Sequence, residues 1–468
     1  MTGETLSRFF DSSEERELQV NAQPTLMTQG PIWKRIVFFA MPLFFGNLFQ
    51  QLYNTVDSLV VGNFIGSEAL AAVSSSGNLI QLLIGLIQGV FIGAGVVISR
   101  YYGARDSENV GRAIHTMVAF ALLAGIALSV FGVAFTPSIL RLMRTPESVL
   151  PNSTLYFRIY FGGILALMMY NCACGILQAV GDSRHPLFYL LVSSGLNVAL
   201  DLLFVIVFGW GIAGVGIATV ISQAFSAALS YWHLCHTRME HRVVLSQLRL
   251  DARTLRQILH AGLPTGVQNS IISFANVIVQ SHINSFGAMA MAGCGTYAKL
   301  EGFGFLPIGS FALAMGTFIG QNLGARAYDR ALKGSRFAIV ACVVLAECIA
   351  GTIYIFAPTL ISWFNSEEHV IAYGVMQART ITPFYFILAA SHCIAGILRG
   401  AGKAIVPMVV MMVCWCFIRI AYLEIILWKF NDIKWLFRAY PITWTLSTTV
   451  FLIYYFKADW LHAYDKRA

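Results

Sequence analysis

The chain has 468 residues, of which 57% are hydrophobic and 12% are charged, whereas about 25% of the residues of an ordinary soluble domain are charged. This composition excludes a soluble globular protein. The formal net charge is +8, but Lys and Arg stand in short segments between apolar runs and do not gather on one basic face. We therefore expect a lipid bilayer as the partner of this chain, and no nucleic acid.

Residues 1–30 are polar and have no apolar core, which predicts a cytoplasmic N-terminal tail and no cleaved signal peptide. Apolar blocks separated by charges and by Gly or Pro turns follow, and about 20 apolar residues suffice for a membrane-spanning helix. They predict an all-α integral membrane protein with twelve transmembrane helices. The expected spans are 35–60, 69–99, 113–136, 153–180, 187–208, 211–234, 256–284, 290–321, 336–358, 371–398, 405–428 and 436–457.

The positive charges predict the orientation of these helices, because Lys and Arg accumulate in cytoplasmic segments. With the N-terminus inside, most of the Lys and Arg residues fall in the segments that are then cytoplasmic. We therefore expect both termini in the cytoplasm, with residues 461–468 as a C-terminal tail.

The two halves of the chain resemble each other at an offset of 221 or 222 residues. The clearest matches pair Met41-Pro42 with Leu263-Pro264, Asn47 with Asn269, Gly103-Ala104-Arg105 with Gly324-Ala325-Arg326, and Gly175-Ile176-Leu177 with Gly396-Ile397-Leu398. This repeat predicts a six-helix lobe over residues 31–235, a cytoplasmic linker over 236–255 and a second six-helix lobe over 256–460.

An even number of spans in each half gives both lobes the same orientation in the membrane. Parallel repeats of this kind are typical of secondary transporters, which alternate access between two lobes. Small residues also recur four apart at matching places, as Gly95, Ser99 and Gly103 and as Gly316, Gly320 and Gly324. Such spacing lets helix backbones approach closely, so we expect helix packing there.

Ionisable groups inside a bilayer are costly and usually face a cavity or a partner, which makes each one a functional candidate. The spans contain Asp57, Asp201, Lys299, Glu301, Glu347, Arg379, Arg419 and Glu424. Lys299 and Glu301 are two residues apart, which places them on different faces of a helix. The sequence leaves the roles of Lys299, Glu301, Glu347, Arg419 and Glu424 open.

Asp57 belongs to a polar stripe on the first span. The stripe comprises Asn47, Gln50, Gln51, Tyr53, Asn54 and Asp57. Asn54, Tyr53 and Gln50 lie about one or two helical turns before Asp57 and so share its face, which predicts a polar cavity wall. The alternative is that Asp57 lies at the outer membrane interface, because it is near the end of the span.

Pro42 stands fifteen residues before Asp57 in the same span. Proline removes a backbone hydrogen bond and permits a kink. We expect Pro42 to act as a hinge, although a static kink explains the residue equally well.

Asn197 and Asp201 are four residues apart in the fifth span and are therefore neighbours on one helix face. A carboxylate beside an amide oxygen offers the hard oxygen ligands that a small cation prefers. The same carboxylate can instead bind a proton, because burial raises the pKa of a carboxyl group. The pair predicts coupling to H+ or Na+ and leaves the choice between them open.

The sequence contains no HExxH, GxSxG or P-loop motif. Its nine cysteines form no CxxC pair, and its ten histidines form no HxxxH pair within a span. We therefore expect no enzyme, no organic cofactor and no metal beyond a Na+ at the coupling site. We also expect a monomer.

Three stretches carry a resemblance to a known family. They are P-L-F-F-G-N-L-F-Q-Q-L-Y-N-T-V-D-S-L-V-V-G at 42–62, I-L-Q-A-V-G-D-S-R-H-P at 176–186 and N-V-A-L-D at 197–201. With Gly103-Ala104-Arg105, they resemble the multidrug and toxic compound extrusion (MATE) family, and most of all its prokaryotic branch typified by the DNA-damage-inducible F protein. The resemblance covers roughly residues 31 to 460.

The resemblance implies an antiporter in the bacterial cytoplasmic (inner) membrane. Such a protein exports cationic or lipophilic drugs and toxic compounds in exchange for H+ or Na+, through a V-shaped pair of lobes. By position, the coupling cation would be held by Asp57, Asn197, Asp201 and Thr219. The substrate cavity would be lined by Gln50, Tyr53 and Asn171, and we add Asn54 from the polar stripe.

The second half departs from the other main prokaryotic branch, which carries an acid in the seventh helix. Here Pro264 is followed by Gln268 and Asn269, and no carboxylate precedes Glu301. Coupling through the first lobe is therefore favoured, with Gln268, Asn269, Lys299 and Glu301 as second-lobe candidates. Two alternatives of the same fold are a lipid-linked oligosaccharide flippase, whose cavity needs Arg or Lys for pyrophosphate, and a dedicated metabolite or peptide exporter.

Overall fold

A computed structural model describes residues 26–61, 65, 67–142, 147, 150–430 and 432–464, without the side chains of 54, 56–60, 67–84 and 142. The described residues are almost entirely helical, and none of them lies in a β-strand. This agrees with the predicted class, because in lipid every backbone N–H and C=O must be satisfied internally and a helix does so within one segment.

The first half contains six helical spans at the expected places. They are α3 (Ile32–Val60), α4 (Ser67–Gly103), α5 (Ser107–Leu142), α6 (Leu150–Gly162) with α7 (Ile164–Ala179), α8 (Arg184–Leu202) with the π-helical turn Leu203–Val207, and α9 (Gly211–His236). The fourth span is bent by 45° between α6 and α7.

The second half repeats this order after a connection that contains the 3-10 turn Leu245–Gln247. Its six spans are α10 (Ala252–Asn284), α11 (Ala288–Gly324), α12 (Tyr328–Ser362), α13 (Glu368–Ile381) with the 3-10 turn Thr382–Phe384 and α14 (Tyr385–Gly400), α15 (Ile405–Met411) with the π-helical stretch Met412–Ile418 and α16 (Arg419–Phe430), and α17 (Ile433–Lys457).

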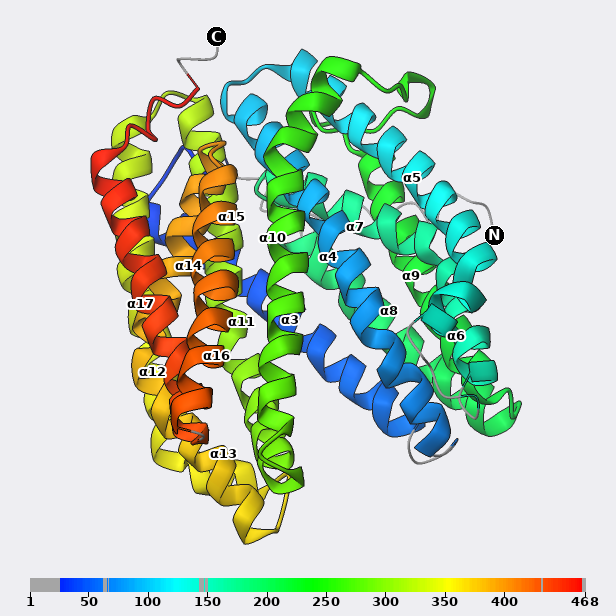
Figure 1. Cartoon of the computed structure of the whole chain (residues 1–468). Helices are drawn as coiled ribbons and strands as arrows, with labels where there is room; N and C mark the ends of the chain where they lie inside the picture. Colours follow the sequence, from blue (N-terminus) through cyan, green and yellow to red (C-terminus); the bar gives the residue numbers. More distant parts are fainter. Residues whose placement is uncertain are drawn as a thin grey trace, which may run out of the picture.

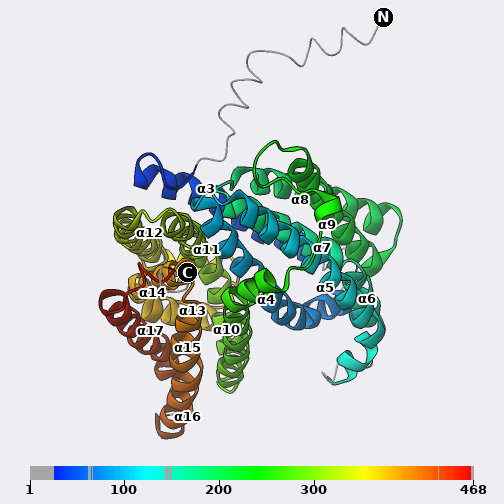
Figure 2. The same cartoon turned by 90° about the horizontal axis from the view of Figure 1, so that it is seen from above.

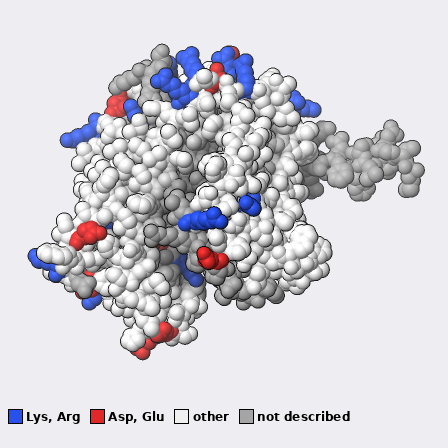
Figure 3. All heavy atoms as spheres, turned by 45° about the vertical axis from the view of Figure 1, so that its right-hand side comes forward, with Lys and Arg blue, Asp and Glu red and all other residues white. Residues whose placement is uncertain are grey.

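Within the described residues, eight helical stretches are long and apolar enough to cross a membrane, and the bent pair α6–α7 makes a ninth. Helices α4, α10 and α17 complete the twelve, with 37, 33 and 25 residues. Even 25 helical residues extend about 37 Å, more than the hydrocarbon core of about 30 Å. Figure 3 shows a largely uncharged surface, with many Lys and Arg side chains at the upper end of the molecule and others at mid-height and near the lower end.

The helices form two bundles that meet along α3, α4, α10 and α11 (Figures 1 and 2). Helix α3 runs between the bundles: its first turns, with Ile36, Phe39 and Leu43, belong to an apolar core built mainly from α11, α12 and α14. Further along, α3 packs against α8. The two halves are therefore joined by helix packing as well as by the chain.

The predicted repeat is visible in the backbone. Arg105 and Arg326 have φ values of 57° and 56°, a left-handed conformation that non-glycine residues rarely adopt. Each follows the end of a helix, α4 at Gly103 and α11 at Gly324. The same local sequence, Gly-Ala-Arg, therefore ends the second span of both halves with the same turn.

Glycines let the halves approach closely at this end of the molecule. A Cβ atom added to Gly324 would lie 2.0 Å from the carbonyl oxygen of Arg100, and one added to Gly103 would lie 2.0 Å from that of Gln321. These two contacts are related by the repeat, since Gln321 and Gly324 correspond to Arg100 and Gly103. The expected small-residue packing is therefore an interface between the halves.

A second glycine contact joins α4 to α10. Added Cβ atoms at Gly89 and Gly93 would lie 2.1 and 2.2 Å from the backbone nitrogens of Gly266 and Gly262. Pro264 lies inside α10 at this place, and the helix continues through it without interruption, as α3 does through Pro42. The role of Pro42 as a hinge stays a prediction.

Candidate functional site

A cavity of about 550 Å³ lies within the first-half bundle, where this bundle meets α11 of the second half. Its wall comes from α3, α4, α6, α7, α8 and α9 of the first half, and α11 of the second half adds Leu313, Gly316 and Thr317. A volume of this size is typical of cavities that enclose small organic molecules. Because both halves contribute, a relative movement of the bundles would change its shape.

The cavity wall is polar but uncharged. Six amide side chains line it, from Asn47, Gln50, Gln88, Asn171, Gln178 and Gln223. Four tyrosines add aromatic surface, namely Tyr53, Tyr156, Tyr160 and Tyr170. Among the lining residues that the structure describes, none is an acid or a base.

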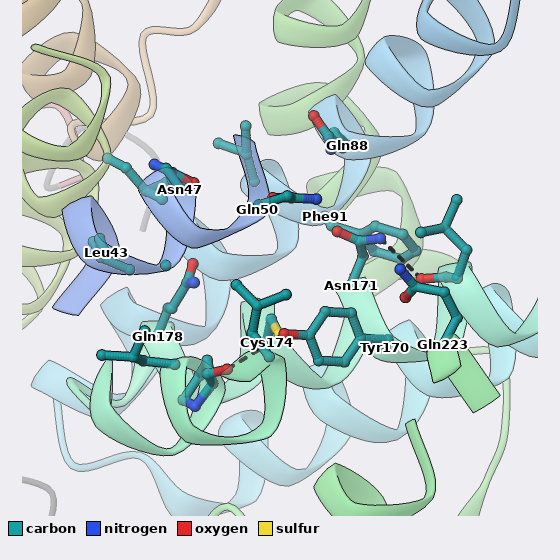
Figure 4. Close-up of a pocket in the computed structure, with 18 of the residues that line it drawn as sticks. Leu43, Asn47, Gln50, Gln88, Phe91, Tyr170, Asn171, Cys174, Gln178 and Gln223 are labelled. Carbon is teal, nitrogen blue, oxygen red and sulfur yellow. Dashed lines mark hydrogen bonds between the residues drawn. The ribbon is translucent and has the colours of Figure 1, made fainter. Parts of the chain in front are cut away.

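Figure 4 shows how these groups are arranged. Gln50 projects from α3, and Asn171 and Gln178 project from α7 on the facing side of the cavity. The amide of Asn171 donates a hydrogen bond to the carbonyl oxygen of Leu167 at 2.8 Å. Amides offer both donors and acceptors, so this wall can contact ligands of varied polarity.

The sequence-predicted cavity residues Gln50, Tyr53 and Asn171 line this space, together with Pro42 and Thr219. The hydroxyl of Thr219 donates to the carbonyl oxygen of Val215 at 3.0 Å. The backbones of Asn54 and Asp57 belong to α3, but their side chains lie outside the described part of the structure.

Asn197 and Asp201 lie on a buried face of α8, the helix that packs against α3 and α9. Their exposed fractions are 3% and 1%, and neither side chain lines the cavity. The amide oxygen and nitrogen of Asn197 make no hydrogen bond to any described residue. A buried amide without a partner is costly, so this carbonyl oxygen is available to a ligand.

The second-lobe candidates also lie away from the cavity. Gln268 is buried and its amide donates to the sulfur of Met411 at 2.9 Å, whereas Asn269 faces Gly85 of α4. Lys299 is exposed, with its Nζ 5.6 Å from the centre of the Phe364 ring. The surroundings of these side chains depend on helix packing, which no local sequence pattern predicts.

Glu301 lies within electrostatic range of Arg419. The guanidinium group of Arg419 donates to the hydroxyl oxygen of Thr443 at 2.9 and 3.2 Å and lies 4.5 Å from the centre of the Tyr440 ring. Arg419 is only 2% exposed. This buried group stabilises the packing of α11, α16 and α17.

The other charged residues of the spans contact neighbouring groups near the surface. Glu347 accepts a hydrogen bond from the backbone nitrogen of Phe386 at 2.8 Å. Glu424 lies 3.3 Å from His282, and Arg379 lies 5.8 Å from the centre of the Tyr354 ring. None of them lines the cavity.

Sequence reasoning missed Gln88, Gln178 and Gln223, and it missed the aromatic residues Tyr156 and Tyr160. A polar amide in an apolar span was the available signal for the glutamines. The tyrosines gave no such signal, because aromatic residues also serve as ordinary packing residues in membrane helices.

Comparisons with known proteins agree with this architecture. The MatE family model matches twice, at residues 42–203 and 264–423, so each half carries one copy. The chain is 30% identical over 401 residues to the probable multidrug resistance protein YoeA of Bacillus subtilis, covering 83% of this chain and 86% of that protein. It is 23% identical over 352 residues to a FAD transporter of Shewanella oneidensis, covering 74% and 77% of the two chains.

A solved structure, described as the outward-facing conformation of a multidrug resistance MATE family transporter, superposes with a TM-score of 0.88. The match covers 95% of this chain and 99% of that one, at 22% identity. Likeness at this identity shows the twelve-helix, two-lobe fold alone. Together with the family match to both halves, it establishes that the chain belongs to the MATE family of multi-pass membrane transporters.

Proposed function

We propose that this protein is an antiporter that exports cationic or lipophilic compounds in exchange for H+ or Na+. The observation that carries the proposal is the uncharged cavity of about 550 Å³ that the first half lines with amides and tyrosines and α11 of the second half borders. Tyrosine faces attract organic cations, and each such contact contributes about 0.5–2 kcal/mol. An uncharged aromatic wall therefore suits lipophilic cations of varied shape.

The coupling ion would bind beside the cavity, between α3 and α8. A Cβ atom on Gly46 of α3 would lie 3.7 Å from Leu190 of α8. Asp57 lies eleven residues after Gly46, and Asp201 lies eleven residues after Leu190. The first and fifth spans run in the same direction. With a rise of 1.5 Å per residue in both helices, their backbones come to a similar depth.

Asn197 adds to this region a buried amide oxygen that has no hydrogen-bond partner among the described residues. Two acids and one amide supply oxygen ligands for Na+, and the same acids can bind H+. Binding of the ion would drive transport only through a difference in affinity between the two arrangements of the lobes.

The experiment measures efflux of a fluorescent lipophilic cation from proteoliposomes under separately imposed H+ and Na+ gradients. We expect one gradient to drive efflux by the unmodified protein, and we expect Asp57→Asn and Asp201→Asn to abolish the driven component. Each substitution removes the negative charge that the ion neutralises. The gradient that works identifies the ion.

The matched control is Asp329→Asn, which changes an exposed acid in the first turn of α12 and should leave efflux unchanged. Driven efflux that persists in both Asp57→Asn and Asp201→Asn would contradict the coupling site. If neither gradient moves the cation in the unmodified protein, export of a dedicated metabolite becomes the better proposal, as the similarity to a FAD transporter suggests.

Tyr160 tests the contribution of aromatic surface. Its ring lines the cavity and stacks on Tyr156 with the ring centres 6.4 Å apart. We expect Tyr160→Leu to raise KM for a lipophilic cation about 2- to 30-fold, because a cation contact with a ring contributes about 0.5–2 kcal/mol. Tyr160→Phe keeps the ring and should stay close to the unmodified protein. Equal effects of the two substitutions would show that the hydroxyl group matters and the ring face does not.

A further inference from the structure

Three potential metal ligands meet near the start of α8 and the end of α9, and none of them lines the cavity. Asp182 lies between α7 and α8, His185 lies in the first turn of α8, and His233 lies in the last turn of α9. One ligand atom from each lies within 4.8 Å of the other two, and no other such group occurs among the residues that the structure describes.

Specific contacts hold these side chains together. The Nδ1 atom of His185 lies 2.5 Å from Oδ2 of Asp182. The rings of His185 and His233 lie 4.3 Å apart at an interplanar angle of 40°. These contacts hold the carboxylate and the two imidazoles close enough for each to turn one ligand atom toward a shared ion.

A further histidine, His241, is buried in the adjoining α9–α10 connection. It is 1% exposed, and its Nδ1 atom has no hydrogen-bond partner among the described residues. It lies outside the group of three whose ligand atoms are within 4.8 Å of one another.

The internal repeat shows that the fold itself does not require this group. At an offset of 221 residues, the positions of Asp182, His185 and His233 are occupied in the second half by Lys403, Val406 and Tyr454. The helices around them are nonetheless equivalent, since α17 (Ile433–Lys457) repeats α9 (Gly211–His236).

A role in capping the N-terminus of α8 explains Asp182 but not the histidines beside it. Asp182 accepts hydrogen bonds from the backbone nitrogens of Arg184 and His185 at 3.1 and 3.2 Å, as a residue at a helix N-terminus commonly does. That role does not need His233. The approach of His233 to Asp182 and His185 therefore calls for a different reason.

We propose that Asp182, His185 and His233 form a binding site for a divalent transition metal ion, of which Zn²⁺ is the representative. Imidazole and carboxylate groups are the ligands that such ions prefer, and three of them leave the fourth position of a tetrahedral site to water. Zinc bonds of about 2.0–2.2 Å bring ligand atoms to about 3.4 Å from one another, so the side chains must close slightly around the ion.

The ion would join the turn before α8 to the end of α9. Ser183 and Pro186, which alternate with the ligands along the chain, line the transport cavity. The proposed site therefore lies directly behind the cavity wall, on an element that carries cavity residues. Its occupancy can be measured without any transport assay, so this inference and the proposed antiport function can fail separately.

The test is calorimetric titration of ZnCl2 into the full-length protein in detergent, stripped of metal and purified with a histidine-free tag. We expect one ion per chain, together with an increase in thermal stability, because a ligand that binds only the folded state stabilises it. His185→Gln combined with His233→Gln should weaken binding at least tenfold. Co²⁺ absorption in the visible range provides a second readout.

Two variants serve as matched controls. His236→Gln changes an exposed histidine one turn beyond His233, and His462→Gln changes a histidine that contacts Asp459 at 2.7 Å, as His185 contacts Asp182. Both should bind Zn²⁺ as the unmodified protein does. Absence of saturable binding and of any stabilisation by Zn²⁺ in the unmodified protein would overturn the site, whether or not the double variant folds. So would wild-type affinity in a folded double variant.

Discussion

Replacement of Arg419 by methionine should destabilise the protein by about 1.5–3 kcal/mol, the usual contribution of hydrogen bonds to a charged group. Arg419 is 2% exposed, and its guanidinium group lies within electrostatic range of Glu301. The substitution removes two hydrogen bonds to Thr443 and the contact with the Tyr440 ring. The loss of the monodisperse peak on heating in detergent measures the change in stability.

A double-mutant comparison separates charge from packing. If the unpaired charge of Glu301 causes most of the loss, Arg419→Met combined with Glu301→Gln should recover a large part of it. The control is Arg438→Met on α17, because Arg438 is exposed and lies 4.5 Å from the centre of the Trp435 ring, the same ring distance as between Arg419 and Tyr440. Equal stability losses in Arg419→Met and Arg438→Met would refute the argument.

Replacement of Gly324 by alanine should reduce transport at least tenfold. The added Cβ would lie 2.0 Å from the carbonyl oxygen of Arg100, and neither atom belongs to a side chain that can rotate away. Overpacking of this kind typically costs about 1–3 kcal/mol or forces the backbone to shift. Here the shift would separate the two halves where they meet, so the arrangement seen in the structure would become less populated.

Efflux from proteoliposomes measures this effect, with Gly302→Ala as the control. Gly302 lies in the same helix, α11, and a Cβ added there meets no atom within 4 Å. The control substitution should transport normally. If Gly324→Ala transports as well as Gly302→Ala, the close approach of α4 and α11 is not required in the transport cycle.

The sequence by itself determined the twelve helices, the repeat and the family. Long apolar runs form helices in lipid because a helix satisfies its own backbone hydrogen bonds. Local residue chemistry also fixed the turns, as the matching conformations of Arg105 and Arg326 show. Such features depend on neighbours along the chain, and they can be read without knowing how the helices pack.

Only the tertiary structure decided which polar side chains share a site. Gln50 and Asn171 were expected at the cavity, but Gln223 and Tyr160 were not, because the face that a helix presents depends on the helices around it. Glu301 and Arg419, like His185 and His233, come from different helices. Their meeting reflects the packing of whole helices, which depends on many weak contacts and is not encoded in any local pattern.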